Sequence, residues 1–523
     1  MSQDNKDLQS TSIKDVEQLG TFAALASLSY VFWICGGMEM VERLAYYGVR
    51  QSSGIYVTDA ASNGGLGLLE SDLGIIFLVW AVVQTFVPVF TGGISDRLGY
   101  KETIFASTIF KILGYVIMGF FPSFWGFTVG AITLAFGTGI FKPGIQGTIS
   151  KATNRSNSSM AWGVFYQTVN IGGAIGPMLA VYLRQLSWDM LFFACAAIIS
   201  LNFLLLLTYK EPDKEARLER RRKVKAGEVK EDNLALDSLK ELLNPVLLWY
   251  VLLFSGFWFM LMAFWDIAPL YFRDWVDTTA MVSQIFGEGG TQNGFWKFFW
   301  GMSQDGTEIM PEGLVNLNAI LIMFVCFLVA GFSAKMRAVT SMAIGTFLAS
   351  AALITFAGFN YAWIVVAGVV IFSLGEMLSS PKSSEYLANI APRDKKAMFL
   401  GFTQLPLGIG WILESYLGPN LYGAYSSKDM LARKALEAGG MEQGTIDAIP
   451  VREAFDVLVA NSEQSAAVLT EQLYSSAGVG VVWYILGVVG LISAFGMFVY
   501  GRWTYRFAMQ MQAEQAAAAQ PAE

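Results

Sequence analysis

Residues 39–48 read EMVERLAYYG and place two acids, a base and two tyrosines inside a long apolar stretch. Because an α-helix turns once in about 3.6 residues, most of these side chains and one further arginine would share an arc of roughly a hundred degrees. The arc holds Glu39, Glu42, Arg43, Tyr46 and Arg50. Each charge at the centre of a membrane helix costs about 2.5 to 3.5 kcal/mol on insertion scales. We therefore expect the charged members to face partners and a hydrated cavity.

The composition is that of a membrane protein. Of the 523 residues, 54% are hydrophobic and 15% are charged, and the mean hydropathy is +0.47. The formal net charge of -7 does not indicate nucleic-acid binding, because most acids lie in two hydrophilic insertions. The three cysteines lie in apolar segments, so we expect no disulfide, no metal and no cofactor. The chain has no histidine, so a proton carried near neutral pH must reside on a carboxylate.

Apolar segments long enough to cross a bilayer recur along the chain in two groups of six. They predict an all-α membrane protein with 12 transmembrane helices in two six-helix bundles. The expected divisions are a tail at 1–25, a bundle at 26–208, a linker at 209–244, a bundle at 245–502 and a tail at 503–523. Hydrophilic insertions interrupt the second bundle at 273–313 and 422–477.

Charge predicts how these segments are oriented. The linker carries a basic cluster at 220–225, which the positive-inside bias places in the cytoplasm together with both termini. The two insertions then lie outside, where the helical periodicity of residues 447–473 indicates a helical hairpin or cap. Residues 1–20 are polar and show no cleavable signal, so we expect a multi-pass protein of the plasma membrane, the inner membrane of a bacterium.

Residues 92–101 read GGISDRLGYK and follow the second apolar segment. They resemble the GxxxDRxGRR loop of the major facilitator superfamily. In such a loop the paired glycines would allow a tight turn, while Asp96 and Arg97 would contact a neighbouring helix end. An ordinary turn with the same residues is the alternative. Together with the two groups of six apolar segments, the resemblance implies the major facilitator superfamily fold. It also implies a rocker-switch transporter that holds its substrate near the bilayer midplane.

Residues 39–48 also resemble the ExxERFxYYG signature of the proton-dependent oligopeptide transporter family, with leucine at position 44 where phenylalanine is usual. The resemblance implies that Glu39, Glu42 and Arg43 form a proton-linked network. It also implies that Tyr46 and Tyr47 line a peptide site. By the same resemblance Arg50, two residues beyond this segment, would bind substrate or form an outer gate. A static cluster of buried ion pairs is the alternative.

Residues 137–144 read GTGIFKPG and resemble the family's GTGxxKPN segment, with glycine in place of the final asparagine. An ammonium in mid-membrane needs an anionic partner, so Lys142 should pair with Glu39, with Glu42 or with the carboxylate of a substrate. Competition between these partners would couple protons to transport. Alternatively, Lys142 snorkels to the membrane interface. Pro143 should kink the helix.

Residues 165–173 read FYQTVNIGG and are similar to the family pattern FYxxINxG. Tyr166 and Asn170 are four residues apart and therefore share a helix face. An amide that offers both a donor and an acceptor suits the backbone of a peptide, so Asn170 is a candidate substrate ligand. The alternative is that the amide and the glycines only pack helices together.

The second half matches the family less closely. Residues 375–381 read GEMLSSP and resemble its GExxxSP segment, which implies that Glu376 receives the amino terminus of a peptide. Lys382 follows at a place where the family pattern has small or apolar residues. Asp266 occupies roughly the place of the family's acidic gate residue, and Asn318 that of its Asn-Pro. The resemblance gives no role to Glu414.

The resemblance implies a proton-coupled symporter that imports di- and tripeptides by alternating access, and not an enzyme. Lys142, Arg43 and Arg50 would face the peptide carboxylate, and Glu376 its amine. Protonation of Glu39, Glu42 or Asp266 would release cations and let the halves rock. The expected partners are a small peptide, protons and the lipid bilayer, with no nucleic acid and with a monomer sufficient. Alternatives are proton-coupled uptake of another small solute, such as an amino acid, nitrate or another anion, or a membrane sensor that transports nothing.

Overall fold

The structure is a computed structural model that describes residues 21–154, 157–212, 214–226, 242–333, 335–390 and 402–519. In these residues the backbone is helical, apart from connecting loops and an isolated β-bridge between Met302 and Ile309. The prediction of an all-α protein is therefore confirmed.

The long helices form two groups of six. The first group comprises α3 (Tyr30–Thr58), α4 (Glu70–Leu98), α5 (Tyr100–Phe120), α6 (Phe124–Ala152), α7 (Ser158–Arg184) and α8 (Trp188–Leu207). The second comprises α11 (Pro245–Trp275), α14 (Pro311–Ser333), α15 (Ala338–Gly358), α16 (Ala362–Ile390), α18 (Gln404–Tyr425) and α23 (Val481–Ala519). In the described part of the chain, ten helices are long and apolar enough to cross a membrane by composition alone. The remaining two long helices are α3, which carries the intramembrane charges, and α18, which is rich in glycine and tyrosine.

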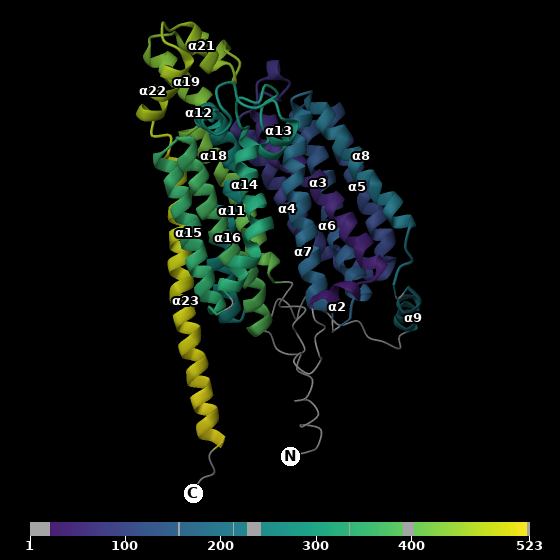
Figure 1. The fold of residues 1–523 in the computed structure, drawn as a ribbon. Helices are drawn as coiled ribbons and strands as arrows, with labels where there is room; N and C mark the ends of the chain where they lie inside the picture. The colour runs from purple at the N-terminus through teal and green to yellow at the C-terminus, as the bar shows by residue number, and fades with distance from the viewer. Residues whose placement is uncertain are drawn as a thin grey trace.

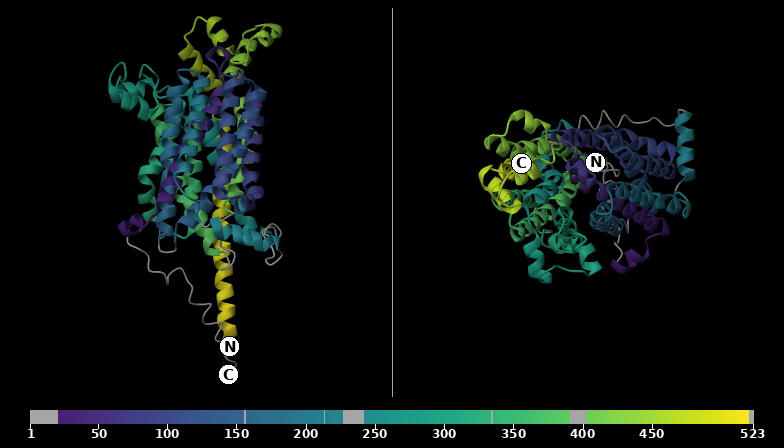
Figure 2. Two further views of the ribbon diagram at one scale, coloured as in Figure 1. Left: turned by 90° about the vertical axis from the view of Figure 1, so that its right-hand side faces the viewer. Right: turned by 90° about the horizontal axis from the view of Figure 1, so that it is seen from above.

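The two groups stand side by side, and the shorter helices lie at their ends (Figure 1, Figure 2). Within the first half α3 packs against α7 and α8, and within the second half α11 packs against α18 and α23. The halves meet where α4 contacts α18, α7 contacts α14 and α3 contacts α11. The charged helix α3 therefore belongs to one bundle and faces the other.

Glycines let α7 approach the charged part of α3. A Cβ atom at Gly172 would lie 2.6 Å from the Met40 carbonyl oxygen and 2.8 Å from the Arg43 Cβ atom. One at Gly176 would meet the carbonyl oxygen of Leu44. Small residues at such crossings are the usual means of close packing in membranes, so these positions fix α3 within its bundle.

The turn between α4 and α5 differs from the prediction. Residues 92–98, which include the paired glycines 92 and 93 of the GGISDRLGYK segment, are the last residues of α4, and the chain turns at Gly99 alone. Gly99 has φ +127°, a conformation that glycine adopts without strain and other residues rarely adopt. The paired glycines therefore do not form the tight turn. The side chains of Asp96 and Arg97 lie outside the described residues.

The insertions lie at the end of the molecule opposite α2 (Thr21–Ala26), the linker helix α9 (Lys214–Lys225) and the C-terminal end of α23 (Figure 1). The first contains α12 (Thr279–Phe286) and α13 (Gly294–Trp300). The second contains α19 (Lys428–Ala438), α20 (Gln443–Ala448), α21 (Ala454–Ala460) and α22 (Ala466–Ser476), which we call the cap. Residues 447–473 do not form two long hairpin helices, because Pro450 and the polar residues 461–465 interrupt the helical run.

The cap belongs to the second half but is bound to the first through Arg452. Its Nε and Nη2 atoms donate to the Leu68 carbonyl oxygen at 2.9 and 2.6 Å, and its Nη1 atom lies 2.7 Å from Glu70 Oε1. Both charged side chains are almost completely buried. This contact ties the outer parts of the two halves together.

At the opposite end, α23 continues well past the other helices (Figure 1). It contains 39 residues, which at 1.5 Å per residue gives a length of about 58 Å. A bilayer core is about 30 Å thick, so the C-terminal part of α23 is a helical arm that leaves the bundle.

Candidate functional site

The charges of α3 are paired within the first half. Arg43 Nε lies 3.0 Å from Glu39 Oε1 and also contacts Glu42. Lys142 Nζ on α6 lies 2.9 Å from Glu39 Oε1, which is one of the partners expected for it. Because Glu39 is fully buried, the ammonium is directed at α3 rather than at the membrane interface. The helix α6 continues through Pro143 to Ala152.

Lys111 on α5 is a member of this cluster that sequence reasoning missed. Its Nζ atom lies 2.9 Å from Glu42 Oε1, and its side chain is 1% exposed. Gly137 on α6 makes room for the Lys111 side chain, because a Cβ atom at this position would lie 2.9 Å from Lys111 Cγ. A lone lysine in the apolar segment 102–121 was the available signal. With Lys111 included, three cations face two carboxylates, so the cluster has one positive charge in excess.

Lys142 is the accessible cation of the cluster. Its side chain is 34% exposed, whereas that of Arg43 is 5% exposed and that of Lys111 is 1% exposed. An exposed ammonium in the middle of a long membrane helix can be reached by a solute. The excess charge of the cluster is thus available at Lys142.

The predicted aromatic residues surround the cluster. The Arg43 guanidinium lies 5.2 Å from the ring centre of Tyr46 and 5.6 Å from that of Tyr47. Tyr46 donates to Gln84 Oε1 at 3.0 Å, while the Tyr47 ring lies 6.0 Å from the ring of Trp265 in the second half. Only Tyr47 of this pair therefore reaches across the boundary between the halves.

On α7, Tyr166 is 45% exposed although it lies inside a membrane helix, and Asn170 follows it one turn later on the same face. The Asn170 Nδ2 atom is buried and has no partner among the described residues. Tyr166 also lies near the Glu376 carboxylate of the second half. The two residues of the FYQTVNIGG segment thus border the boundary between the halves and retain a free amide donor.

Glu376 on α16 is the matching acid of the second half. The Asn318 Nδ2 atom on α14 donates to Glu376 Oε2 at 2.9 Å and to Ser373 Oγ at 3.1 Å. No cation among the described residues forms an ion pair with Glu376. Lys382, six residues after Glu376 on the same helix, instead has its Nζ atom 2.7 Å from Glu385 Oε2. Glu376 therefore has a carboxylate that an incoming ammonium can neutralise.

Arg50 and Asp266 form an ion pair between the halves, with 2.7 Å from Arg50 Nη2 to Asp266 Oδ1. The guanidinium is covered by aromatic rings, 4.0 Å from the ring centre of Phe77 and 5.3 and 5.6 Å from those of Trp80 and Trp411. Of the two roles that the resemblance offered for Arg50, this geometry fits the gate, because its charge is already engaged.

A second ion pair between the halves was also missed. Arg184 at the end of α7 contacts Glu312 at the start of α14 with two nitrogens, Nε to Oε1 at 2.6 Å and Nη2 to Oε2 at 2.9 Å. Ser52 and Gln51 of α3 add hydrogen bonds to Glu312. With the Arg452 contact, the ion pairs between the halves in the described part of the chain all lie toward the end that carries the insertions.

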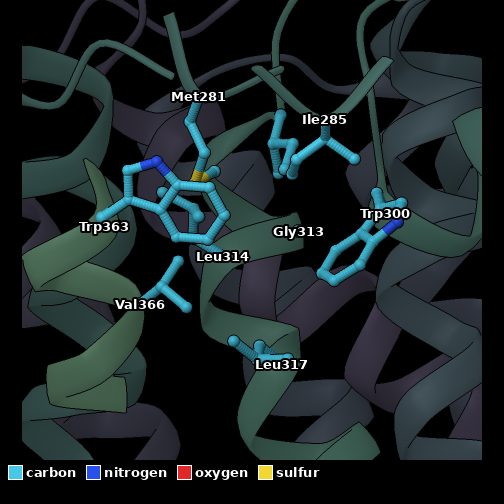
Figure 3. A pocket seen from close by; sticks show the side chains of 9 residues that line it. Met281, Ile285, Trp300, Gly313, Leu314, Leu317, Trp363 and Val366 are labelled. Carbon is cyan, nitrogen blue, oxygen red and sulfur yellow. The ribbon is translucent and has the colours of Figure 1, made fainter. Parts of the chain in front are cut away.

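A separate pocket opens at the outer rim between α12, α13, α14 and α16 (Figure 3). It is lined by Met281, Ile285, Trp300, Ile309, Gly313, Leu314, Leu317, Trp363 and Val366. None of these side chains carries a charge, so the pocket cannot recognise an ion and does not belong to the charged site.

The family model described as Major Facilitator Superfamily matches residues 43–415 of the chain. The chain is 28% identical over 178 residues to the uncharacterized transporter YclF of Bacillus subtilis (strain 168), covering 33% of this chain and 35% of that protein. It is also 28% identical over 152 residues to a di-/tripeptide transporter of Lactococcus lactis subsp. cremoris, covering 28% of this chain and 31% of that protein. The chain thus spans about a third of the length of these curated relatives.

A solved structure of a POT family transporter, in complex with a thioalcohol-conjugated peptide, matches with a TM-score of 0.62. The sequence identity is 15%, and the match covers 90% of this chain and 96% of that chain, so it establishes the fold alone. These relatives confirm the resemblance drawn from the sequence motifs. The chain belongs to the major facilitator superfamily, in which its motifs and its curated relatives associate it with the proton-dependent oligopeptide transporters.

Proposed function

We propose that the protein is a proton-coupled symporter that imports di- and tripeptides by alternating access. One observation best supports this proposal: one half carries an accessible ammonium, Lys142, and the other carries a carboxylate, Glu376, that forms no ion pair with a cation of the described residues. A peptide is a zwitterion, so its two ends suit these two charges. The resemblance to a di-/tripeptide transporter of Lactococcus lactis supports the same substrate class.

The backbone of the peptide would lie between these charges. Asn170 offers a buried amide donor that has no partner among the described residues, and the half-exposed side chain of Tyr166 lies one turn before it. Tyr47 with Trp265 adds an aromatic wall that spans both halves. Groups that bind backbone atoms, rather than side chains, suit a transporter that accepts many peptides.

Proton coupling follows from competition for Lys142. In the structure its ammonium is held by Glu39, which also neutralises Arg43. A peptide carboxylate that pairs with Lys142 leaves Glu39 with one cation fewer, so Glu39 gains affinity for a proton. Substrate and proton would then bind together, as symport requires.

One end of the molecule is closed by contacts between the halves. The ion pairs Arg50–Asp266 and Arg184–Glu312 and the cap contact close the end that carries the insertions. We place this end outside the plasma membrane and both termini in the cytoplasm, which makes the structure an outward-closed state of the transport cycle. A monomer contains every group used here.

The proposal is tested in proteoliposomes with an inward pH gradient and radiolabelled alanylalanine. Unlabelled di- and tripeptides should compete for uptake, whereas alanine and nitrate should not, and collapse of the gradient should stop accumulation. Competition by alanine or nitrate but not by peptides would refute the peptide assignment, and binding without flux would favour the sensor. Lys142→Ala should abolish gradient-driven accumulation, with Lys434→Ala, an exposed lysine of α19, as the matched control.

A further inference from the structure

Glu414 on α18 is a buried acid that the proposed mechanism does not use. Its side chain is 0% exposed, and neither of its carboxyl oxygens accepts a hydrogen bond from a donor in the described part of the chain. A buried ionised carboxylate without a donor is among the least favourable groups in a protein interior. Glu414 must therefore be stabilised by something other than a hydrogen-bond donor of the described residues.

The backbone directs this carboxyl group toward α11. A Cβ atom at Gly418, one turn further along α18, would collide with Glu414 Oε1 and would lie 3.4 Å from Ile267 Cδ1. The carboxyl group thus occupies the space that the glycine leaves, beside the residue that follows Asp266. Trp411, three residues before Glu414 and on the same face of α18, covers the Arg50 guanidinium at 5.6 Å.

Glu414 consequently joins the ion pair between the halves. Its carboxyl group is within hydrogen-bonding reach of the Asp266 carboxyl group, and Arg50 is the nearby cation. Among the described residues, no other charged group acts on Glu414 from the helices packed around it, since α4 contributes the neutral rings of Phe77 and Trp80.

Two ionised carboxylates can only accept hydrogen bonds, so they cannot bond to each other. They can do so once one of them holds a proton, as carboxyl pairs in a shared site do. A single proton also balances the charge, because Arg50 supplies one positive charge against two acids. Both Asp266 oxygens lie close to Arg50, so the two Glu414 oxygens, which accept no hydrogen bond from the described residues, are the positions available for that proton.

We propose that Glu414 and Asp266 form a proton-binding pair that holds one proton between them in the outward-closed state, with Arg50 bound to the remaining negative charge. The site is distinct from the Glu39–Lys142 cluster and takes a proton rather than a peptide. The proton-binding claim stands on this geometry, whereas its part in gating rests on the proposed function.

The test is infrared difference spectroscopy of the purified protein in lipid nanodiscs during a pH titration, which detects the carbonyl stretch of protonated carboxyl groups. The wild type should keep a protonated-carboxyl band at pH 7 that is lost in Glu414→Gln and also in Asp266→Asn, because each substitution leaves one acid for one Arg50. Glu437→Gln, an exposed acid of α19, should retain the band. A band that survives in either pair variant, or its absence from the wild type, overturns the proposal.

Alanylalanine uptake by the same variants separates this inference from the proposed function. In Asp266→Asn, Glu414 can take over as the partner of Arg50, so part of the gradient-driven uptake should remain and should be lost when Glu414→Gln is added. Equal uptake by the single and the double variant counts against the pair. If no variant and no wild type transports the peptide, yet the band behaves as expected, the proposed function fails and the proton-binding pair stands.

Discussion

The contact between the cap and the first half should control how readily the outer end opens. Arg452→Gln removes the guanidinium that neutralises Glu70, whose side chain is 2% exposed. Breaking a buried ion pair by removing one partner costs about 3 to 5 kcal/mol, because the other charge stays buried. This cost applies to the closed state alone, since Glu70 regains water when the halves separate. The ratio of open to closed molecules should therefore rise by about a hundredfold or more.

Spin labels at positions 62 and 445 report this change, because they lie on exposed parts of the first half and of the cap. Double electron–electron resonance should show longer distances in Arg452→Gln. The double variant Glu70→Gln with Arg452→Gln removes the stranded charge, so most of the closed population should return. Arg433→Ala, whose side chain bonds only to carbonyl oxygens within the cap, is the control for local damage. Unchanged distances in Arg452→Gln, or a double variant as open as the single one, would refute the reasoning.

Three further predictions concern the charged groups. Glu376→Gln should reduce uptake of free peptides more than of amino-terminally blocked ones in competition assays, because the amide cannot neutralise an ammonium; equal losses would contradict this. Exchanging the charges of Arg50 and Asp266 should restore more uptake than either single change allows, and additive damage would exclude their pairing. Burial and the charge of Asp274 raise the pKa of Asp429 to about 6, so it stabilises the folded cap fully below about pH 4 and loses this contribution as pH rises through 6. The melting temperature of the wild type should accordingly fall over that range relative to Asp429→Asn, and parallel pH profiles would show that Asp429 does not matter.

The sequence was sufficient to predict the pairings that arise within one helix or one motif. Glu39 and Arg43 are four residues apart, so their contact follows from helical spacing alone. The partnership of Lys142 with Glu39 was one of three expected for an ammonium in mid-membrane, and the structure places Lys142 Nζ 2.9 Å from Glu39 Oε1. Lys111 could have been found by the same reasoning, because a lysine within an apolar segment also needs an anion.

Several contacts between distant helices could not be predicted in this way. Arg184 and Glu312 each lie at the end of a membrane helix, where charged residues are ordinary, and only the docking of α7 on α14 brings them together. Glu414 and Asp266 belong to different helices of the second half, and their proximity depends on the glycines that bring α18 against α11. The short helices of the cap were missed for a local reason, since apolar periodicity continues across Pro450 while the helix cannot.

The long C-terminal part of α23 is a helical extension of the second half. This helix packs on α11 and α15, so its projecting segment must turn with that bundle, and its tip travels farther than any point on the bundle's own surface. A fluorophore or a rigid fiducial protein fused near residue 519 would magnify small rotations during turnover. The same arm distinguishes the second bundle from the first, which helps to orient individual particles in electron cryomicroscopy.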